Sequence, residues 1–547
     1  MDRFISTNPD KAERVPLQSA PHTLAAKDAP FLHVRYAEGR VVATGSPTAF
    51  AGHRIGQPEQ PQGLYGEWHW DGRSLTATVD PLGFFSLFVY TKGSEIAVSP
   101  SILHLLALGA DPEPDHLAMA VFHRIGSFVG EDTPFRHIKV LPPAGKLVWR
   151  EGEVKITGGA PVPREEALTR NQAVEGFIEL PRAALRRFTA SWDGPVVLPL
   201  SGGRDSRHIL LELVHQGRKP DSCVTFHHGG RYLNDEVQAA RVVAERANVP
   251  HILLGHPRLR LRDAVRALLL TQLCADEHAQ MMPMHDYLSG TAAATIDGIG
   301  GDILTNPDDS AAEFMVLARR GDFHGIARTM AAGHGHIISR PGHKGGAGAV
   351  HSPDLEAAAI DRIANEIRRF QDAPDPYQAF WFWNRTRREI NFVSTGILGG
   401  AAMVACPFLD PDFVRLGLSL PWSVTSDQKL HDDAITRAYP AFSDIPYAEG
   451  FRSIPSPRIR LDRLRNGLDS LRVAAMARPG VAAVNAMLMT LSKGPLWRAR
   501  ADIYRVHKDF VDRMDANEAR RLIALRDFLD QTATKGKGLV SDVFPGS

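Results

Sequence analysis

The feature that most constrains the fold is the junction at residues 196–213, which reads VVLPLSGGRDSRHILLEL. An apolar run typical of a buried strand stops at Ser201, two glycines follow, and an amphipathic run typical of a helix begins. Glycines at such a turn let backbone N–H groups converge without Cβ clashes, and the helix adds unpaired N–H groups and a positive dipole end. Ser201 and Ser206 add hydroxyl donors. The junction therefore predicts a cradle for a polyanion, most naturally a phosphate chain.

An acidic residue, Asp205, lies inside this cradle. A carboxylate would repel a phosphate, but magnesium is commonly held by one or two carboxylates together with substrate phosphate. The stretch matches neither GxxxxGK[ST] nor G-x-G-x-x-G. A bare Ser-Gly-Gly is often a chance turn. With a strand before it and an acid, a serine and a helix after it, we favour a site for a nucleotide pyrophosphate and its metal.

Strands and helices alternate after this junction. Apolar runs at 222–226 and 251–254 are separated by a helical pattern over 234–249. This spacing predicts a parallel sheet with right-handed crossovers. The preceding segment, 157–188, begins as a Gly/Pro linker and continues as an amphipathic helix that Pro181 is expected to kink or end. Residues from about 260 onward read mostly helical.

The first 155 residues have a different residue pattern, in which short β-rich runs alternate with turns. Two pairs of β-rich runs flank Asp71-Gly72 and Lys92-Gly93, which are hairpin signals. Short helices are expected near 102–108 and 116–124. This half is therefore expected to be β-rich.

Length and charge bound the function. A chain of 547 residues predicts two or more domains, and a net charge of +1 gives no electrostatic case for a nucleic-acid or membrane-surface partner. The chain shows no apolar run of transmembrane length and no signal-peptide pattern at its start. The three cysteines are far apart, so we expect no disulfide framework and a cytoplasmic location.

Four stretches of the second half carry a family resemblance. LSGGRDS (200–206) resembles the pyrophosphate loop of the asparagine synthetase superfamily, which usually reads SGGxDS. NDEVQAARVVAERANVPH (234–251), DGIGGDIL (297–304) and CPFLDPDFVRLGLSLP (406–421) resemble three later segments of that family, in the same order.

The first half agrees with the same family. GEWHWDGRSLTATVDPLGFFSLFVY (66–90) resembles the core of its glutaminase domain, and FRHIKVLPPAGKLVW (135–149) resembles the stretch where that domain closes. The resemblance spans roughly residues 60–455 and implies an α/β protein of two domains. Residues 1–157 would form a β-rich, Ntn-type (class II glutaminase-like) αββα domain. Residues 165–547 would form an adenine-nucleotide α-hydrolase-like (PP-loop) domain, with a parallel sheet and many helices.

The resemblance also implies a set of site residues. The residues expected to hold the pyrophosphate of ATP are Ser201, Gly202, Gly203, Asp205 and Ser206. The residues expected to lie against the nucleoside are Leu198, Thr225 and Gly298. Asp205 and Asp302 are expected to be the two Mg²⁺ ligands, so ATP and Mg²⁺ are the expected cofactors.

The chain departs from the family at the glutaminase nucleophile. A glutaminase of this class uses a cysteine directly after the initiator Met, whereas this chain has Asp2 and no cysteine before Cys223. A carboxylate cannot replace the thiolate nucleophile. The β-rich half is therefore expected to be a structural remnant without glutaminase activity.

The chain also departs at the synthetase site. Ile299 and Ile303 stand where the family carries acids, and isoleucine is neither acid nor base. Glu389 is the candidate base by position, and an ion pair with a neighbouring arginine is its competing role. Arg452 or Arg458 could replace a family lysine that steadies phosphate charge, and plain surface arginines are the competing reading. The aromatic run AFWFWNRTRR (379–388) could stack a substrate, and a buried helix face is the favoured use.

The function expected from these features is an ATP-dependent amide-forming ligase. It would adenylate a substrate carboxylate, release pyrophosphate, and capture the acyl-adenylate with an amine of the same substrate, as in β-lactam synthetases and lasso-peptide macrolactam cyclases. The expected partners are a carboxylate-bearing substrate such as a peptide and a peptide-processing protease. Two alternatives stay open: an asparagine-synthetase-like ligase that uses free ammonia on aspartate or a related acid, and a non-catalytic nucleotide-binding scaffold.

Overall fold

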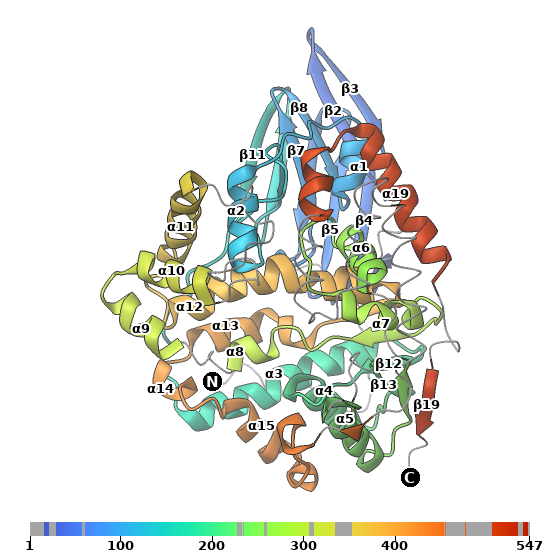
Figure 1. The fold of residues 1–547 in the computed structure, drawn as a ribbon, viewed down its shortest axis with the longest axis vertical. Coiled ribbons are helices and arrows are strands. Elements are labelled where there is room, and N and C mark those ends of the chain that lie inside the picture. The colour runs from blue at the N-terminus through green and yellow to red at the C-terminus, as the bar shows by residue number, and fades with distance from the viewer. Residues whose placement is uncertain are drawn as a thin grey trace.

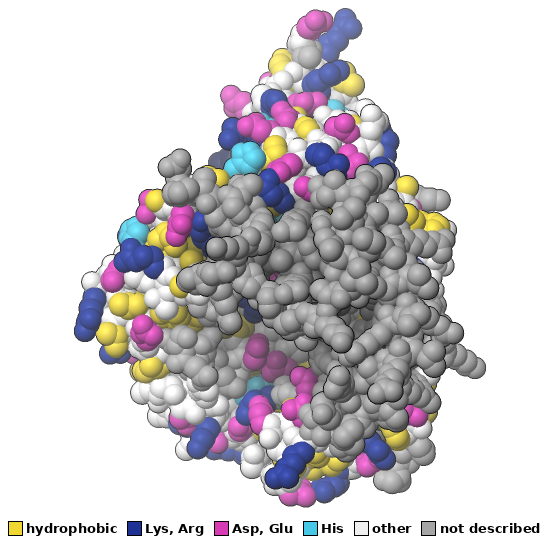
Figure 2. Space-filling view, viewed as in Figure 1, with side chains coloured by type: hydrophobic (Ala, Val, Ile, Leu, Met, Phe, Trp, Pro, Cys, Tyr) yellow, Lys and Arg dark blue, Asp and Glu magenta, His cyan; other side chains and the backbone are white. Residues whose placement is uncertain are grey.

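The computed structural model describes residues 16–20, 29–56, 61–226, 232–233, 235–255, 260–305, 311–333, 353–452, 454–455, 476, 506–533 and 540–544. Within these ranges the chain is a mixed α/β protein, with mostly strands in its first third and with most of its helices and a further sheet in the remainder (Figure 1). No helix among the described residues combines the length and the apolar character needed to cross a bilayer. On the face seen in Figure 2, described basic and acidic side chains are interspersed.

Two antiparallel sheets form the first third of the chain. One has the order β1 (Leu17–Ala20), β4 (Thr48–Ile55), β5 (Tyr65–Trp70), β6 (Ser74–Val79), β10 (Lys146–Arg150), β11 (Glu153–Thr157). The other has the order β3 (Arg40–Gly45), β2 (Leu32–Ala37), β8 (Glu95–Ser99), β7 (Phe88–Lys92), β9 (Ile138–Val140). The expected hairpins are confirmed as β5–β6 and β7–β8.

The two sheets face each other across one apolar core. Trp68, Leu75 and Trp149 of the first sheet share a buried cluster with Val34 and Val89 of the second. This arrangement follows from the alternation of inward apolar and outward polar residues along each strand. The helices expected near 102–108 and 116–124 are confirmed as α1 (Ile102–Ala107) and α2 (His116–Ile125).

A third sheet organises the rest of the chain. Its order is β17 (Met403–Ala405), β16 (Ala294–Ile296), β12 (Val196–Pro199), β13 (Ser222–Phe226), β15 (His251–Leu254), β19 (Val540–Phe544). The first five strands are parallel, as the alternating pattern predicts. The antiparallel edge strand β19 comes from the end of the chain, and nothing in the local pattern predicted it.

Helices surround this parallel sheet (Figure 1). The longer ones are α3 (Arg170–Ser191), α4 (Arg204–His215), α5 (Asp235–Arg246), α6 (Arg260–Leu270), α7 (Met282–Leu288), α9 (Ala311–Arg319), α10 (Phe323–Gly333), α11 (Pro353–Arg368), α13 (Pro411–Ser419), α15 (Leu430–Ala438) and α19 (Ala516–Gln531). The shorter ones include α8 (Gly301–Thr305), α12 (Pro376–Trp381), the π-helix η3 (Phe382–Ile390), η4 (Val393–Ile397) and α14 (Trp422–Thr425). Pro181 was expected to kink or end this helix; it does not end it, because α3 continues through Pro181 to Ser191.

The hydrophobic core does not divide between the two regions. Phe84 and Phe85 of the β-rich region share one buried cluster with Phe177 of α3 and Phe380 of α12. The late helix α19 packs beside α1 (Figure 1) and shares a second cluster with it. The region carrying the parallel sheet is therefore buttressed by the β-rich region over a wide apolar contact.

Candidate functional site

The strand order of the parallel sheet fixes where a ligand can bind. From β12 the chain moves outward through β13 to β15, and then returns to the other side of β12 to form β16 and β17. In open parallel sheets, ligands bind at the carboxyl ends of the strands where the order reverses. That point lies between β12 and β16, where the loops that contain Ser201–Ser206 and Gly298–Asp302 follow these two strands.

A cavity of about 520 Å³ opens at this point. Both loops contribute polar residues to its lining, and about half of the lining residues are apolar. The polar and glycine residues that line it are Ser201, Asp205, Ser206, Thr225, Glu236, Asp297, Gly298, Gly300, Asp302, Arg385 and Thr386. The apolar side chains that line it are Pro199, Leu200, Val224, Phe226, Met281, Met284, Ile296, Ile299, Ile303, Trp381, Ile390 and Val393.

The serine hydroxyls of the first loop are arranged to leave a donor for a ligand. The backbone N–H of Ser201 donates to Ser206 Oγ at 3.0 Å, and that of Gly203 donates to Ser201 Oγ at 3.2 Å. The two hydroxyl oxygens lie 3.1 Å apart, so one hydroxyl donates to the other. The second hydroxyl proton of the pair stays available to an acceptor in the cavity.

Asp205 occupies the centre of the site because the second loop comes unusually close to it. A Cβ at Gly298 would lie 2.6 Å from Asp205 Cβ, and one at Gly301 would lie 2.4 Å from Asp205 Oδ1. Only glycine permits this approach. The glycines of GIGG therefore bring Asp302, on the first turn of α8, beside Asp205, on the first turn of α4.

Acidic groups dominate the electrostatics of the cavity. Burial first, and the nearby Asp302 second, raise the pKa of Asp205 well above its ordinary value. Burial likewise raises the pKa of Asp297, which accepts a hydrogen bond from Ser394 Oγ at 2.6 Å. Among the described residues that line the cavity, Arg385 is the sole lysine or arginine. A polyanion needs additional positive charge to bind here.

The donor set fits a divalent cation such as Mg²⁺. Asp205 lines the cavity with a carboxylate that is buried and lies close to a second acid. Asp302 lies next to it, and carboxylate oxygens are the ligands that Mg²⁺ prefers. A cation between Asp205 and Asp302 would supply the positive charge that the cavity lacks.

Most of the residues expected to bind the nucleotide lie at the cavity or directly behind it. Thr225 lines it and donates from Oγ1 to the Leu200 carbonyl at 2.6 Å. Leu198 is fully buried in β12, one layer behind the lining. Gly202 is also behind the lining, where a Cβ would lie 2.9 Å from Glu236 Cα. Gly203 serves as the N-cap of α4.

The two residues expected to be catalytic do not line the cavity. Arg452 is exposed, and its carbonyl accepts a hydrogen bond from Gln238 at 2.7 Å. Glu389 is fully buried, and its Oε1 lies 2.8 Å from Nε2 of His278. Burial opposes the charge of His278, but Glu389 outweighs burial and raises its pKa. The expected Glu389–arginine pair is therefore replaced by a Glu389–His278 pair just outside the cavity wall. Arg458 lies outside the described residues.

Sequence reasoning missed several cavity residues. Asp297 had a signal, because it ends the run before Gly298 in DGIGGD. Trp381 and Arg385 had a weaker sequence signal, the aromatic run itself. Phe380 and Phe382 form a buried helix face, as expected, whereas Trp381 and Arg385 line the cavity. The wider turns of the π-helix η3 change which residues lie on the same face of the helix. No residue pattern in the sequence predicts a π-helix.

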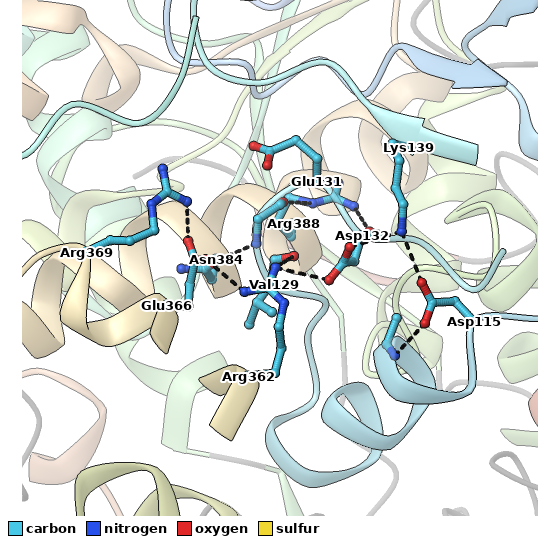
Figure 3. Close-up of polar contacts among 12 residues, drawn as sticks. Asp115, Val129, Glu131, Asp132, Lys139, Arg362, Glu366, Arg369, Asn384 and Arg388 are labelled. Atoms are coloured by element: carbon cyan, nitrogen blue, oxygen red, sulfur yellow. Dashed lines mark hydrogen bonds and ion pairs between the residues drawn. The ribbon is translucent and has the colours of Figure 1, made fainter. Parts of the chain in front are cut away.

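The helix that carries Arg385 is anchored by the β-rich region (Figure 3). Asn384 Oδ1 accepts from the backbone N–H of Gly130 at 2.7 Å, and Arg388 Nε donates to the Gly130 carbonyl at 3.0 Å. Asp132, from the same loop, accepts from Arg362 of α11 at 3.1 Å. The loop after α2 therefore fixes one wall of the cavity.

Comparison with known proteins adds no assignment: no family model matches this chain, and no curated protein matches it in sequence.

Proposed function

We propose that this chain is an ATP-dependent carbon–nitrogen ligase that forms AMP and pyrophosphate. The observation that carries the proposal is the meeting of Asp205, Asp302 and the Ser201–Ser206 loop at one cavity, at the reversal point of a parallel sheet. A carboxylate of the substrate attacks the α-phosphorus of ATP, the bond from that phosphorus to the bridging oxygen breaks, and pyrophosphate leaves. An amine then attacks the acyl carbon, AMP leaves, and the amine loses a proton to a base.

The chain's own residues orient these reactants. The Ser201–Ser206 pair and the N-terminal end of α4 hold the phosphate chain through hydroxyl and backbone donors. Asp205 and Asp302 would hold Mg²⁺, which when bound would neutralise negative charge on the pyrophosphate. Arg385 adds a fixed positive charge at the same cavity. Binding of the carboxylate and the amine in this one cavity would bring them together, so proximity would supply much of the rate.

The finer fold assignment is part of this proposal. We assign the two facing antiparallel sheets to a glutaminase-like remnant, and the parallel sheet to an adenine-nucleotide α-hydrolase-like domain. The packing of two antiparallel sheets and the strand order of the parallel sheet support this assignment.

The apolar wall favours an amine carried by the substrate itself. Ile299, Ile303 and Trp381 line the cavity close to Asp302. Free aspartate carries an ammonium and a second carboxylate, which would lose water against this wall without compensation. A peptide presents amide groups and apolar side chains around one carboxylate. A macrolactam-forming, lasso-cyclase-like reaction therefore suits the wall better than ammonia capture by aspartate.

A base must take the proton that the attacking amine loses. Glu389 and His278 form a buried pair beside the cavity residues Arg385 and Ile390. This pair can accept a proton without exposing a charge to solvent. Ile299 and Ile303 cannot take the proton, and since Glu389 and His278 do not line the cavity, the proton would pass to this pair through an intervening water.

The test follows the nucleotide. The chain is incubated with Mg·ATP and three acceptor sets: aspartate with ammonia, β-amino acids, and short peptides bearing an internal Asp or Glu. Products are separated as AMP with pyrophosphate or ADP with phosphate, with Asp205→Ala and Asp302→Ala as controls. We expect AMP with a peptide acceptor, lost in both variants. AMP with aspartate and ammonia would select the alternative ligase, ADP would contradict the mechanism, and binding without turnover over the full panel would favour a scaffold.

A further inference from the structure

A pair of buried histidines lies behind Asp205. His431, from α15, places its Nδ1 3.4 Å from Asp205 Oδ1. Its Nε2 lies 3.0 Å from Nδ1 of His208, which follows Asp205 by one turn on α4. Both imidazoles are fully buried. The three side chains therefore form a short line that runs from the cavity into the core.

This line contains three buried polar atoms without a hydrogen-bond partner among the described residues. They are Asp205 Oδ1, His431 Nδ1 and His208 Nε2. Buried polar groups are nearly always paired, so each exception calls for an explanation. The rings cannot easily turn to find other partners, because Phe408 lies 5.6 Å from His208 and 5.8 Å from His431, centroid to centroid.

The hydrogen bond between the two rings decides where the protons sit. Each neutral imidazole carries one N–H. If His208 Nδ1 donates to His431 Nε2, the proton of His431 is on Nδ1 and points toward Asp205. The reverse arrangement would place a lone pair of His431 against the carboxylate and bury the Nε2–H of His208 without an acceptor. The first arrangement avoids both penalties, because it leaves unpaired only an acceptor nitrogen among aromatic rings.

We propose that His431 is a positioning residue for Asp205: its Nδ1–H donates to Oδ1 and holds the carboxylate so that the other oxygen is presented to a divalent cation. At 3.4 Å the two atoms are just short of a good hydrogen bond. A small rotation of the carboxylate on cation binding closes it. His208 fixes the tautomer of His431 in turn. Partners of this kind commonly change metal affinity by about 10- to 100-fold. This inference rests on the proposed function, which assigns a cation to Asp205.

Two substitutions at His431 separate a positioning role from a merely structural one. An asparagine amide can stand where Nδ1–H stands, whereas a glutamine amide reaches the position of Nε2. We therefore expect His431→Asn to bind Mn²⁺ within about threefold of the wild-type chain, and His431→Gln to bind it at least tenfold more weakly. Mn²⁺ binding is measured by electron paramagnetic resonance without nucleotide, and thermal unfolding checks that each variant is folded.

The outcomes are distinct. Equal Mn²⁺ affinity in the wild-type chain and both variants overturns the positioning role and leaves the proposed function standing. Absence of Mn²⁺ binding by the wild-type chain overturns the cation assignment, and the positioning role with it.

A measurement on the unmodified chain covers the case in which the variants do not fold. Long-range ¹H–¹⁵N spectra of ¹⁵N-histidine-labelled protein report which ring nitrogen carries the proton. We expect the Nδ1–H tautomer at His431, and finding Nε2–H there would overturn the proposal.

Discussion

Replacing Gly301 with alanine gives a sharp test of the site geometry. The new Cβ would lie 2.4 Å from Asp205 Oδ1 and 2.6 Å from its Cγ. Nonbonded carbon and oxygen atoms need about 3.3 Å, so the carboxylate must retreat by roughly 0.9 Å. It retreats toward a buried surface, where overpacking costs about 1–3 kcal/mol. Gly301 begins α8 and does not have a positive φ. Alanine has a higher helix propensity than glycine, so the substitution would also stabilise the folded state by up to about 1 kcal/mol.

Gly301→Ala is therefore expected to separate function from stability. The net loss of unfolding free energy is about 0–3 kcal/mol, whereas a displacement near 1 Å of a ligand group is expected to lower the affinity for Mg·ATP on the order of 100-fold. Urea unfolding measures the first quantity, and isothermal titration with Mg·ATP measures the second.

The matched control is Gly396→Ala. Gly396 is buried in η4 outside the cavity lining, and a Cβ there would come no closer than 3.4 Å to the Leu270 carbonyl oxygen. We expect this variant to bind Mg·ATP like the wild-type chain. Wild-type affinity in a folded Gly301→Ala variant would refute the reasoning, because it would show that Asp205 can move without consequence.

Three further predictions follow from individual side chains. Arg385→Gln should weaken Mg·ATP binding about tenfold or more, because it removes a positive charge at the cavity. The control Arg452→Gln changes an exposed arginine outside the cavity lining, and titration of this variant with Mg·ATP should show unchanged affinity. Equal effects of the two substitutions would contradict the assignment. Asp80→Ala should cost about 3 kcal/mol or more in urea unfolding, because Asp80 accepts three backbone N–H groups within the loop 82–85, and a loss under 1 kcal/mol would contradict this. His251 and His507 are buried, and burial lowers the pKa of each from 6.5 to about 4. The stability that they contribute is therefore present above pH 6.5 and is lost as pH falls toward 4, by roughly 3 kcal/mol for each histidine. Unfolding curves from pH 7.5 to 4.5 should show this loss, and a stability that does not change with pH would refute the prediction.

The sequence predicted those parts of the molecule whose physics is local. Asp71-Gly72 and Lys92-Gly93 specify hairpins because few residue pairs adopt their turn conformations, and both hairpins formed where expected. The Ser-Gly-Gly turn and the apolar run before it specify the end of β12 and the start of α4. Asp205 and Asp302 met at one cavity because parallel strands expose their carboxyl ends at one edge.

The remaining site residues depend on packing between distant segments. His431 reaches Asp205 only because α15 packs on α4, and no spacing in the sequence couples the two. Arg385 enters the cavity through the wide turns of η3, whereas Glu389 is directed to His278. Pro181 was expected to kink or end α3, yet the helix continues through it to Ser191 with Pro181 buried.

The measurement that tests the central claim most directly is titration of the chain with ATP, with and without Mg²⁺. The comparison includes Asp205→Ala, Asp302→Ala and a control, Asp412→Ala, whose carboxylate is exposed on α13 away from the cavity. The account predicts binding that requires Mg²⁺, is lost in the first two variants and is unchanged in the third. Binding of ATP that is indifferent to Mg²⁺, or that survives both substitutions, would contradict it.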